Sequence, residues 1–368
     1  MVGLDDEVSA KRLADADIVK SLRREIRQTA EPTLRKWFGQ IADDVGGFHG
    51  KIDAAGQPAP DAPRSAVLYT QLLWAFSALS EHLKSAEALA LAHRAAAHLH
   101  GHFIDPDHGG LYFQLNARGQ VTDARKHAYV QASGVQAFAE YARITGNVDS
   151  LRTARDLQRE LEERFWDLQR GGYVAAMSAF WHTPADPRLL ESDPDCPRTA
   201  TAHLRIVEAY GHLHRVAPTD MSQAALHRAL GLYIDRFVDV ASGHLCLFYN
   251  QDWTGEAQGI NYGQDIAASW RLWKAVSTLG DREMQARVRA LSLSLAAAAR
   301  DEGRTPDGCL RAAGYAQVEA LIGFVTAGQI SGNPAYLDAA SKLWPHVKAG
   351  LSQDPCAAAR ILVELDRR

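Results

Sequence analysis

One unit recurs along the chain, and this repeat constrains the fold more than any other feature. The unit consists of an apolar helix that ends at a glycine, a more polar helix, and a glycine turn that leads into a short extended piece. The glycine turns lie at Gly46–Gly47, Gly109–Gly110, Gly171–Gly172, Gly243 and Gly308. Their spacing of roughly 50 to 70 residues indicates a repeat architecture, in which each unit buries its apolar face against its neighbours.

The hydrophobic periodicity predicts twelve helices in six pairs. We expect them at about 8–40, 65–83, 86–103, 127–144, 151–166, 199–216, 223–240, 282–300, 315–330, 335–348 and 356–365, with one more that follows Tyr262–Gly263 and ends at Gly280. Helices that are alternately buried and solvated fit an all-α closed ring of six inner and six outer helices, an (α/α)6 barrel. An open solenoid is the alternative. No Pro-rich or Ser-rich linker divides the sequence, so we expect one domain over residues 1–368.

Composition and charge narrow the class of protein. The formal net charge of -4 gives no reason to expect nucleic acid or an anionic membrane as a partner. No apolar run approaches the roughly 18 to 20 residues that span a bilayer, and the N-terminal sequence lacks the basic patch and apolar core of a signal peptide. The four cysteines are scattered without a C-x-x-C pair, which is typical of reduced thiols. We therefore expect a cytoplasmic protein with a small-molecule substrate and no cofactor.

Six segments carry a resemblance to a known family: Gly46–Asp53, Leu72–Ala78, Arg125–Gln131, Ala202–Tyr210, Tyr262–Trp270 and Tyr315–Ala320. They resemble, in the same order, segments of the N-acylglucosamine 2-epimerase and cellobiose 2-epimerase family, whose signature Y-G-H-D-I-E-x-S-W is similar to Tyr262–Trp270. The resemblance implies an (α/α)6 barrel, sugar 2-epimerisation or aldose–ketose isomerisation, and, by analogy, a homodimer. Such chemistry needs a base and an acid on either side of the carbon next to the carbonyl, and a cation that stabilises the enediolate oxygen.

The residues that handle protons in that family are replaced here. By the resemblance, the family's histidines fall on Arg205, Gln264 and Ala357. Its arginine of the first inner helix falls on Gln71, and the glutamate of the signature falls on Ala267. Glutamine and alanine cannot accept a proton near neutral pH, and loss of both acid and base costs on the order of four decades in rate. Ordinary 2-epimerisation by the family's own acid–base pair is therefore not expected.

Five residues are candidates for a catalytic role: Tyr129, His203, Arg205, Asp265 and Glu319. Arg205 could bind a carboxylate or a phosphate, and its structural alternative is an ion pair with Glu208 at i+3. Tyr129 could act as a neutral acid or be a core aromatic residue, and His203 could be a hydrogen-bonded core histidine. The alternatives for the two acids are a helix cap for Asp265 and a bond between helices for Glu319.

Five further residues are candidates for substrate binding: Gln71, Trp181, Tyr262, Gln264 and Tyr315. Trp181 lies in a long irregular segment, of the kind that often forms a lid or the wall of a pocket. Its ring could stack on a ligand or simply pack within the loop, and Tyr315 could stack in the same way. His98 and His102 lie at i and i+4, but no cysteine or carboxylate stands in register with them, so no metal site is expected there.

Three functions stay open at this point. We favour an epimerase-like enzyme that now runs a different isomerisation, a cyclisation or an elimination on a small molecule. The second is a residual carbohydrate isomerase in which Arg205, His203 or Tyr129 takes over. The third is a binding or scaffold protein without catalysis, because fold alone does not fix function.

Overall fold

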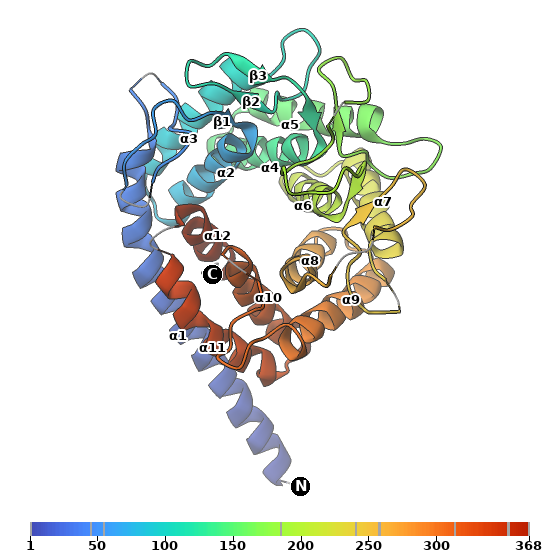
Figure 1. Cartoon of the computed structure of the whole chain (residues 1–368). Helices are drawn as coiled ribbons and strands as arrows, with labels where there is room; N and C mark the ends of the chain where they lie inside the picture. The colour runs from blue at the N-terminus through green and yellow to red at the C-terminus, as the bar shows by residue number, and fades with distance from the viewer. Residues whose placement is uncertain are drawn as a thin grey trace. The chain divides into compact units, whose positions relative to one another are not determined.

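The computed structural model describes residues 2–44, 46–53, 56–184, 186–239, 241–256, 259–312, 314–351 and 354–366, with their side chains from residue 17 onward (Figure 1). Within these residues the chain forms twelve α-helices and seven short strands. The helices are α1 Val2–Ile41, α2 Ala66–His82, α3 Ala86–His98, α4 Ala128–Thr145, α5 Val148–Glu160, α6 Ala200–Val216, α7 Asp220–Arg236, α8 Tyr262–Val276, α9 Arg282–Asp301, α10 Ala316–Ser331, α11 Pro334–Gly350 and α12 Pro355–Leu365.

Each expected helix is present, with small shifts at the ends. The first helix already begins at Val2, and α7 ends at Arg236 rather than at residue 240, which lies outside the described residues. The last turns expected of α3 and α5 are π-helical segments, η1 Leu99–Phe103 and η2 Leu161–Phe165.

Side chains at the helix ends explain these boundaries. Ser65 and Asn147 accept a hydrogen bond from a backbone N–H in the first turns of α2 and α5. Gly146 and Gly332 end α4 and α10 in the left-handed conformation, with φ of 71° and 68°. That conformation costs glycine nothing, which is why these glycines stop the helices.

The strands form three small antiparallel sheets. They are β1 Arg64–Ser65, β2 Gln114–Leu115, β3 Val121–Asp123, β4 Lys126–His127, β5 Ala176–Met177, β6 Arg198–Thr199 and β7 Phe248–Tyr249, ordered β1-β2-β3, β4-β5 and β6-β7. Strands β1, β4 and β6 each lead directly into α2, α4 and α6. Each sheet therefore fixes where one of these three helices begins.

The described residues group into two compact units. Unit 1 comprises residues 1–36, 260–270 and 289–368, and unit 2 comprises residues 37–259 and 271–288. In unit 1, α10 packs on α11 and α12, and Arg27 of α1 forms an ion pair of 2.5 Å with Asp366. The expectation of one domain over the whole chain stays a prediction.

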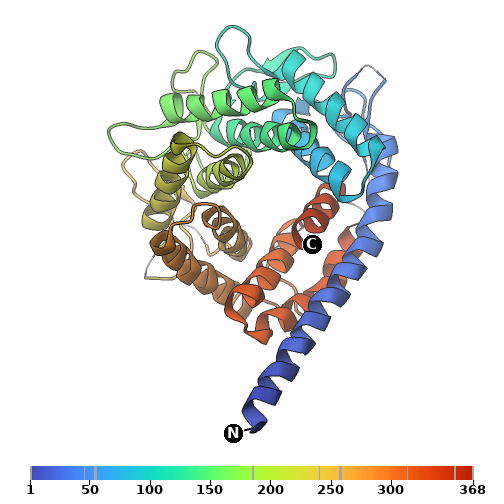
Figure 2. The same cartoon turned by 180° about the vertical axis from the view of Figure 1, so that it is seen from behind.

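In unit 2, the apolar helices α2, α4 and α6 lie side by side, and each is covered by a more polar helix. Helix α4 packs on both α2 and α6, while α3, α5 and α7 cover them from one side (Figures 1 and 2). Nearly every residue of α4 and α6 is buried, whereas α5 buries mainly Ser150, Ala154, Leu157 and Gln158. This is the alternation of buried and one-sided helices that the periodicity predicts.

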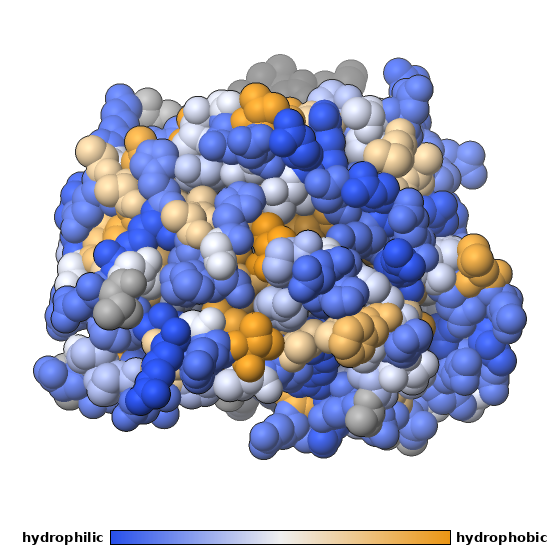
Figure 3. Space-filling model, turned by 90° about the horizontal axis from the view of Figure 1, so that it is seen from above, coloured by the Kyte–Doolittle hydropathy of each residue, from blue (hydrophilic) through white to orange (hydrophobic). Residues whose placement is uncertain are grey.

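The surface carries few large apolar side chains. Leu168 is 92% exposed and Phe180 is 63% exposed, and the face shown in Figure 3 is mainly hydrophilic with separate hydrophobic spots. Among the described residues, no helix has the length and hydropathy that a membrane span requires.

Candidate functional site

Each of the first three glycine turns is joined to the next inner helix by an ion pair whose cation is buried. The pairs are Asp43 with Arg64 at 2.5 Å, Asp105 with Lys126 at 2.7 Å, and Asp167 with Arg198. In each, the acid begins the turn and the cation comes two residues before the helix. Burial raises the pKa of Asp105, but the hydrogen bonds from Lys126 and from the backbone of His108 outweigh burial and bring this pKa to about 2. The acid is therefore charged at neutral pH and holds the turn in place.

A second contact joins each of four turns to an inner helix. A side chain in the first turn of the helix bonds to the backbone of the residue that follows the two glycines, or follows Gly308–Cys309 in the last of these turns. The partners are Tyr69 with Phe48, Gln131 with Leu111, His203 with Tyr173, and Gln317 with Leu310. His203 therefore occupies the same structural position as a tyrosine and two glutamines elsewhere in the repeat.

This position leaves His203 no free ring nitrogen. Its Nδ1 lies 2.8 Å from the carbonyl oxygen of Thr199, which can only accept, so the ring proton is on Nδ1. Its Nε2 accepts from the backbone N–H of Tyr173 at 3.0 Å. Burial lowers the pKa of His203 to about 4, so the ring is neutral near pH 7. The arrangement is the one described above for a hydrogen-bonded core histidine.

Arg205 is the centre of a buried polar cluster in unit 2. Its Nη2 donates to the hydroxyl oxygen of Tyr129 at 2.7 Å, and its guanidinium lies 4.8 Å from the centroid of the Tyr129 ring. Its Nη1 donates to Glu208 at 3.0 Å and to Gln136 at 3.1 Å. The ion pair with Glu208 is present, and Tyr129 lies beside it, so the structure brings two of the catalytic candidates together.

Two arginines meet at one carboxylate in this cluster. Arg271 lies 3.4 Å from the same Glu208 oxygen that pairs with Arg205, so two guanidinium groups share one carboxylate. All three of these residues are buried. The buried Nε of Arg205 has no hydrogen-bond partner among the described residues, and an unsatisfied buried donor costs about 1–3 kcal/mol. An acceptor that reaches this group, from water or from a ligand, would remove that cost.

Trp181 occupies a turn position that two other hairpins give to glycine. Trp181 and Trp253 have positive φ angles of 63° and 62°, while Gly56 and Gly119 have 80° and 79°. In each of the four turns, the backbone N–H directly after the residue with positive φ donates to a side chain earlier in the turn. These side chains belong to Asp53, Asn116, Ser178 and Asn250. The left-handed backbone is unfavourable for tryptophan, so other contacts must hold it there.

Those contacts come from the neighbouring glycine turn. The indole N–H of Trp181 donates to the carbonyl of His108 at 2.9 Å, and the ring meets Phe165 edge-on. A Cβ at Gly110 would lie 2.9 Å from the Trp181 ring, so this glycine allows the ring to cover the turn. These contacts match loop packing, and stacking of Trp181 on a ligand stays a prediction.

The candidates near the start of α8 lie in unit 1. Asn261 caps this helix, because its Oδ1 accepts from the backbone N–H of Gln264 at 3.1 Å. Asp265 therefore does not cap α8: it lies inside the helix and is 1% exposed. The ring of Tyr262 packs close to Gly303, where a Cβ would lie 2.6 Å from its Cγ. Gln264 is half-buried.

The three remaining candidates, Glu319, Tyr315 and Gln71, lie in different environments. Glu319 accepts from the indole N–H of Trp270 at 2.9 Å, which is the bond between helices considered as its structural alternative. Tyr315 is 38% exposed and directly precedes α10. Gln71 lies half-buried on α2. Catalytic or binding roles for these residues stay predictions.

Comparison with known proteins settles the family. Residues 46–266 match the N-acylglucosamine 2-epimerase (GlcNAc 2-epimerase) family. The chain is 31% identical to the cellobiose 2-epimerase of Bacteroides fragilis over 335 residues, which are 87% of this chain and 85% of that protein. This chain belongs to the N-acylglucosamine 2-epimerase family. It is also 26% identical over 336 residues to the cellobiose 2-epimerase of Ruminococcus albus, which covers 88% of this chain and 86% of that enzyme.

Solved structures of the family confirm the fold class. The cellobiose 2-epimerase of Bacillus thermoamylovorans matches with a TM-score of 0.84 and 28% identity, over 90% of this chain and 88% of that one. A D-mannose isomerase matches with a TM-score of 0.74 and 17% identity, over 88% and 84% of the two chains, and this likeness concerns the fold alone. The predicted all-α (α/α)6-barrel class is therefore confirmed.

Two members of the Arg205 cluster are not among the candidate residues predicted from the sequence. Gln136 and Arg271 lie 69 and 66 positions from Arg205 along the chain, and both bond within the cluster. Neither residue lies in a sequence motif that indicates a catalytic or binding role, and only the packing of the helices brings them to Glu208. Arg271, which directly follows the signature segment, is the one that its position could have suggested.

Proposed function

We propose that this epimerase-family chain is an enzyme that carries out an isomerisation, a cyclisation or an elimination on a small molecule without a histidine acid–base pair. The single observation that supports this most directly is the state of His203, whose two ring nitrogens are both bonded to backbone groups. Its pKa of about 4 makes it a poor proton acceptor at neutral pH. The positions that the resemblance assigns to the family's histidines hold Arg205, Gln264 and Ala357.

Arg205 and Tyr129 supply the polar chemistry that this proposal needs. The guanidinium can stabilise negative charge on a carboxylate or an enolate oxygen through charge-assisted hydrogen bonds. Because the hydroxyl oxygen of Tyr129 accepts from Arg205, its own proton points elsewhere and can be donated to a ligand. The pair can thus hold an anionic oxygen and deliver a proton close to it.

The charge of the cluster favours an acidic substrate. Two buried guanidinium groups meet at one carboxylate, and a buried guanidinium attracts an anion more strongly than it does in water. Glu208 and Gln136 bond to Arg205 and fix its orientation, so we assign them a positioning role. The substrate class that follows is a small, oxygen-rich molecule with a carboxylate next to the reacting carbon.

A residual carbohydrate isomerase is the second candidate. The similarity to cellobiose 2-epimerases favours it, and Arg205 with Tyr129 would then act on a neutral aldose. A binding protein without catalysis would use the same cluster but release its ligand unchanged.

Ligand binding separates a site for acids from a site for neutral sugars. Glucuronate and glucose differ in one carboxylate, and a ligand that binds the native state raises the melting temperature. We expect glucuronate or a related sugar acid to raise it for the wild type and for the exposed control Arg152→Gln. Arg205→Gln should weaken that binding about tenfold or more. Equal shifts for glucose and for the acids, or an undiminished shift in Arg205→Gln, would overturn the proposal.

Turnover is then measured with the sugar acid that binds. Proton NMR should show new signals with the wild type and none with Tyr129→Phe, in which the proton donor is removed while the ring remains. Binding without any turnover by the wild type would favour the binding protein over the enzyme.

A further inference from the structure

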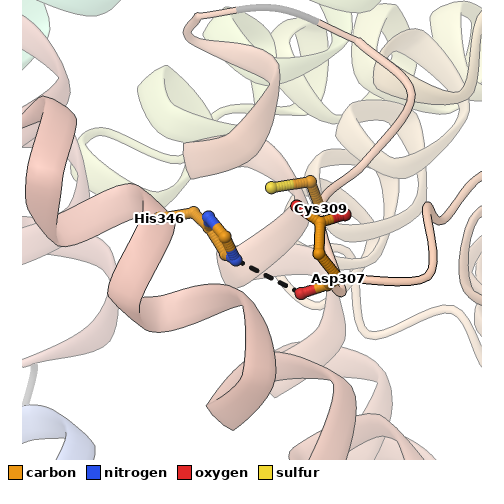
Figure 4. A group of neighbouring side chains, drawn as sticks. All are labelled: Asp307, Cys309 and His346. Atoms are coloured by element: carbon orange, nitrogen blue, oxygen red, sulfur yellow. Dashed lines mark hydrogen bonds between the residues drawn. The ribbon is translucent and has the colours of Figure 1, made fainter.

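The glycine turn between α9 and α10 brings three metal-ligating side chains together in unit 1. Asp307 and Cys309 flank Gly308 in this turn, and His346 lies on α11. One potential ligand atom from each lies within 4.8 Å of the other two. Figure 4 shows the imidazole of His346 reaching from its helix towards the turn that carries the other two residues.

The backbone explains why the turn lies so close to α11. Gly308 has a φ of 95°, a conformation that favours glycine. A Cβ at this position would lie 3.3 Å from the Cβ of Lys342, which is one helical turn before His346. The close approach of the turn therefore falls on the face of α11 that carries His346.

This turn also departs from the repeat in a way that removes its ion pair. In the first three turns, an aspartate bonds through its N–H to the carbonyl of the second glycine. Thr305 makes the corresponding bond here, and its partner is Cys309 instead of glycine. A neutral threonine cannot form the aspartate–cation pair that holds the first three turns. The turn therefore lacks that means of attachment, and a thiol stands where the first three turns have glycine.

Neighbouring hydrogen bonds orient two of the three side chains. The hydroxyl of Thr305 donates to Oδ1 of Asp307 at 2.5 Å, and the Asp307 carboxylate also hydrogen-bonds to the thiol of Cys309. Nε2 of His346 lies 3.2 Å from the carbonyl oxygen of Asp307. Because that oxygen can only accept, the ring proton is on Nε2 and the lone pair is on Nδ1. Metal-binding histidines commonly make such a bond through the nitrogen that does not hold the metal.

We propose that Asp307, Cys309 and His346 form a zinc site that fastens this turn to α11. A thiolate, an imidazole and a carboxylate are the donors that Zn²⁺ takes, whereas Mg²⁺ and Ca²⁺ prefer oxygen alone. Three protein ligands leave one tetrahedral position for water. Asp307 and His346 are exposed and Cys309 is half-buried, so a metal can enter from solvent. The site is independent of the Arg205 cluster and of the proposed function.

The test is metal binding by the full chain and by single variants. The protein is treated with a chelator, dialysed against equimolar Zn²⁺, and analysed for metal content and by titration calorimetry. We expect about one zinc per wild-type chain, a rise in melting temperature with zinc, and no such rise with Mg²⁺ or Ca²⁺. Cys309→Ser and His346→Gln should lose the bound zinc, and Thr305→Ala should weaken binding roughly 10- to 100-fold.

Matched variants control for adventitious binding. Cys246→Ser removes another half-buried thiol and His182→Gln removes another exposed imidazole, and both should bind zinc as the wild type does. With Co²⁺, the wild type should show a thiolate-to-metal absorption band that Cys309→Ser lacks. No stoichiometric zinc in the wild type, or zinc bound equally well by Cys309→Ser, would overturn the site.

Discussion

Replacement of His203 distinguishes a structural histidine from a catalytic one. Gln131 and Gln317 make the same contact in other repeats, each bonding to both the N–H and the carbonyl of one turn residue. Gln in place of His203 can bond to Tyr173 in that way, so we expect His203→Gln to lower the free energy of unfolding by less than about 1.5 kcal/mol. His203→Ala leaves buried backbone groups unpaired and opens a cavity, which should cost about 3–5 kcal/mol.

The same residue makes stability depend on pH. Burial lowers the pKa of His203 from 6.5 to about 4, so between these values the unfolded chain binds a proton that the folded chain does not. The contribution of neutral His203 to the free energy of unfolding is therefore fully present above pH 6.5 and is lost as the pH falls from 6.5 towards 4. The difference in pKa corresponds to about 3 kcal/mol, and His203→Gln removes this part of the acid sensitivity.

Urea unfolding followed by tryptophan fluorescence measures both effects. The free energies of unfolding of the wild type and of His203→Gln should be similar at pH 7.5, and the variant should become relatively more stable as the pH is lowered to 4.5. A loss at pH 7.5 as large as that of His203→Ala, or a parallel pH dependence of the two proteins, would refute the structural assignment.

Three further predictions concern the contacts that hold unit 2, and each is checked by urea unfolding. Lys126→Met leaves the buried carboxylate of Asp105 without its cation and should cost about 3–5 kcal/mol, whereas the exposed control Lys36→Met should change stability by no more than about 0.5 kcal/mol; equal effects would contradict the buried pair. Glu208→Gln removes the carboxylate charge that Arg205 and Arg271 share and should also cost about 3–5 kcal/mol, and the double variant Glu208→Gln/Arg271→Met should recover part of this loss; no recovery would speak against the shared carboxylate. Because the backbone at Trp181 is left-handed, Trp181→Gly should be less destabilising than Trp181→Ala by about 1 kcal/mol, and the reverse order would show that the strain is absent.

Much of the fold could be predicted because the signals for it are local. Apolar periodicity marks the buried helices, while Ser65 and Asn147 mark helix starts and Gly146 and Gly332 mark helix ends. Even the role of His203 has a local signal, since Gln131 lies at the same place in the preceding inner helix. The comparison of equivalent positions between repeats would have revealed it.

The rest of the site depends on contacts between distant segments. The position of Arg271 beside Glu208 follows from helix packing, and no motif reports it. The left-handed backbone of Trp181 could not be predicted either, because tryptophan rarely adopts it and only the contacts with His108 and Phe165 hold it there. For Asp265, the local signal was misleading. An acid near the start of a helix suggests a cap, but Asn261 makes that contact.

Solvent deuterium exchange at the carbon next to the carbonyl tests the central claim most directly. The chain is incubated with cellobiose, glucose, mannose and N-acetylmannosamine in deuterated water, beside a cellobiose 2-epimerase as positive control. On the proposal that both histidine functions are absent, turnover should fall by on the order of four decades or more, so we expect no deuterium uptake from these sugars. Uptake at a rate comparable with the control enzyme would contradict the account.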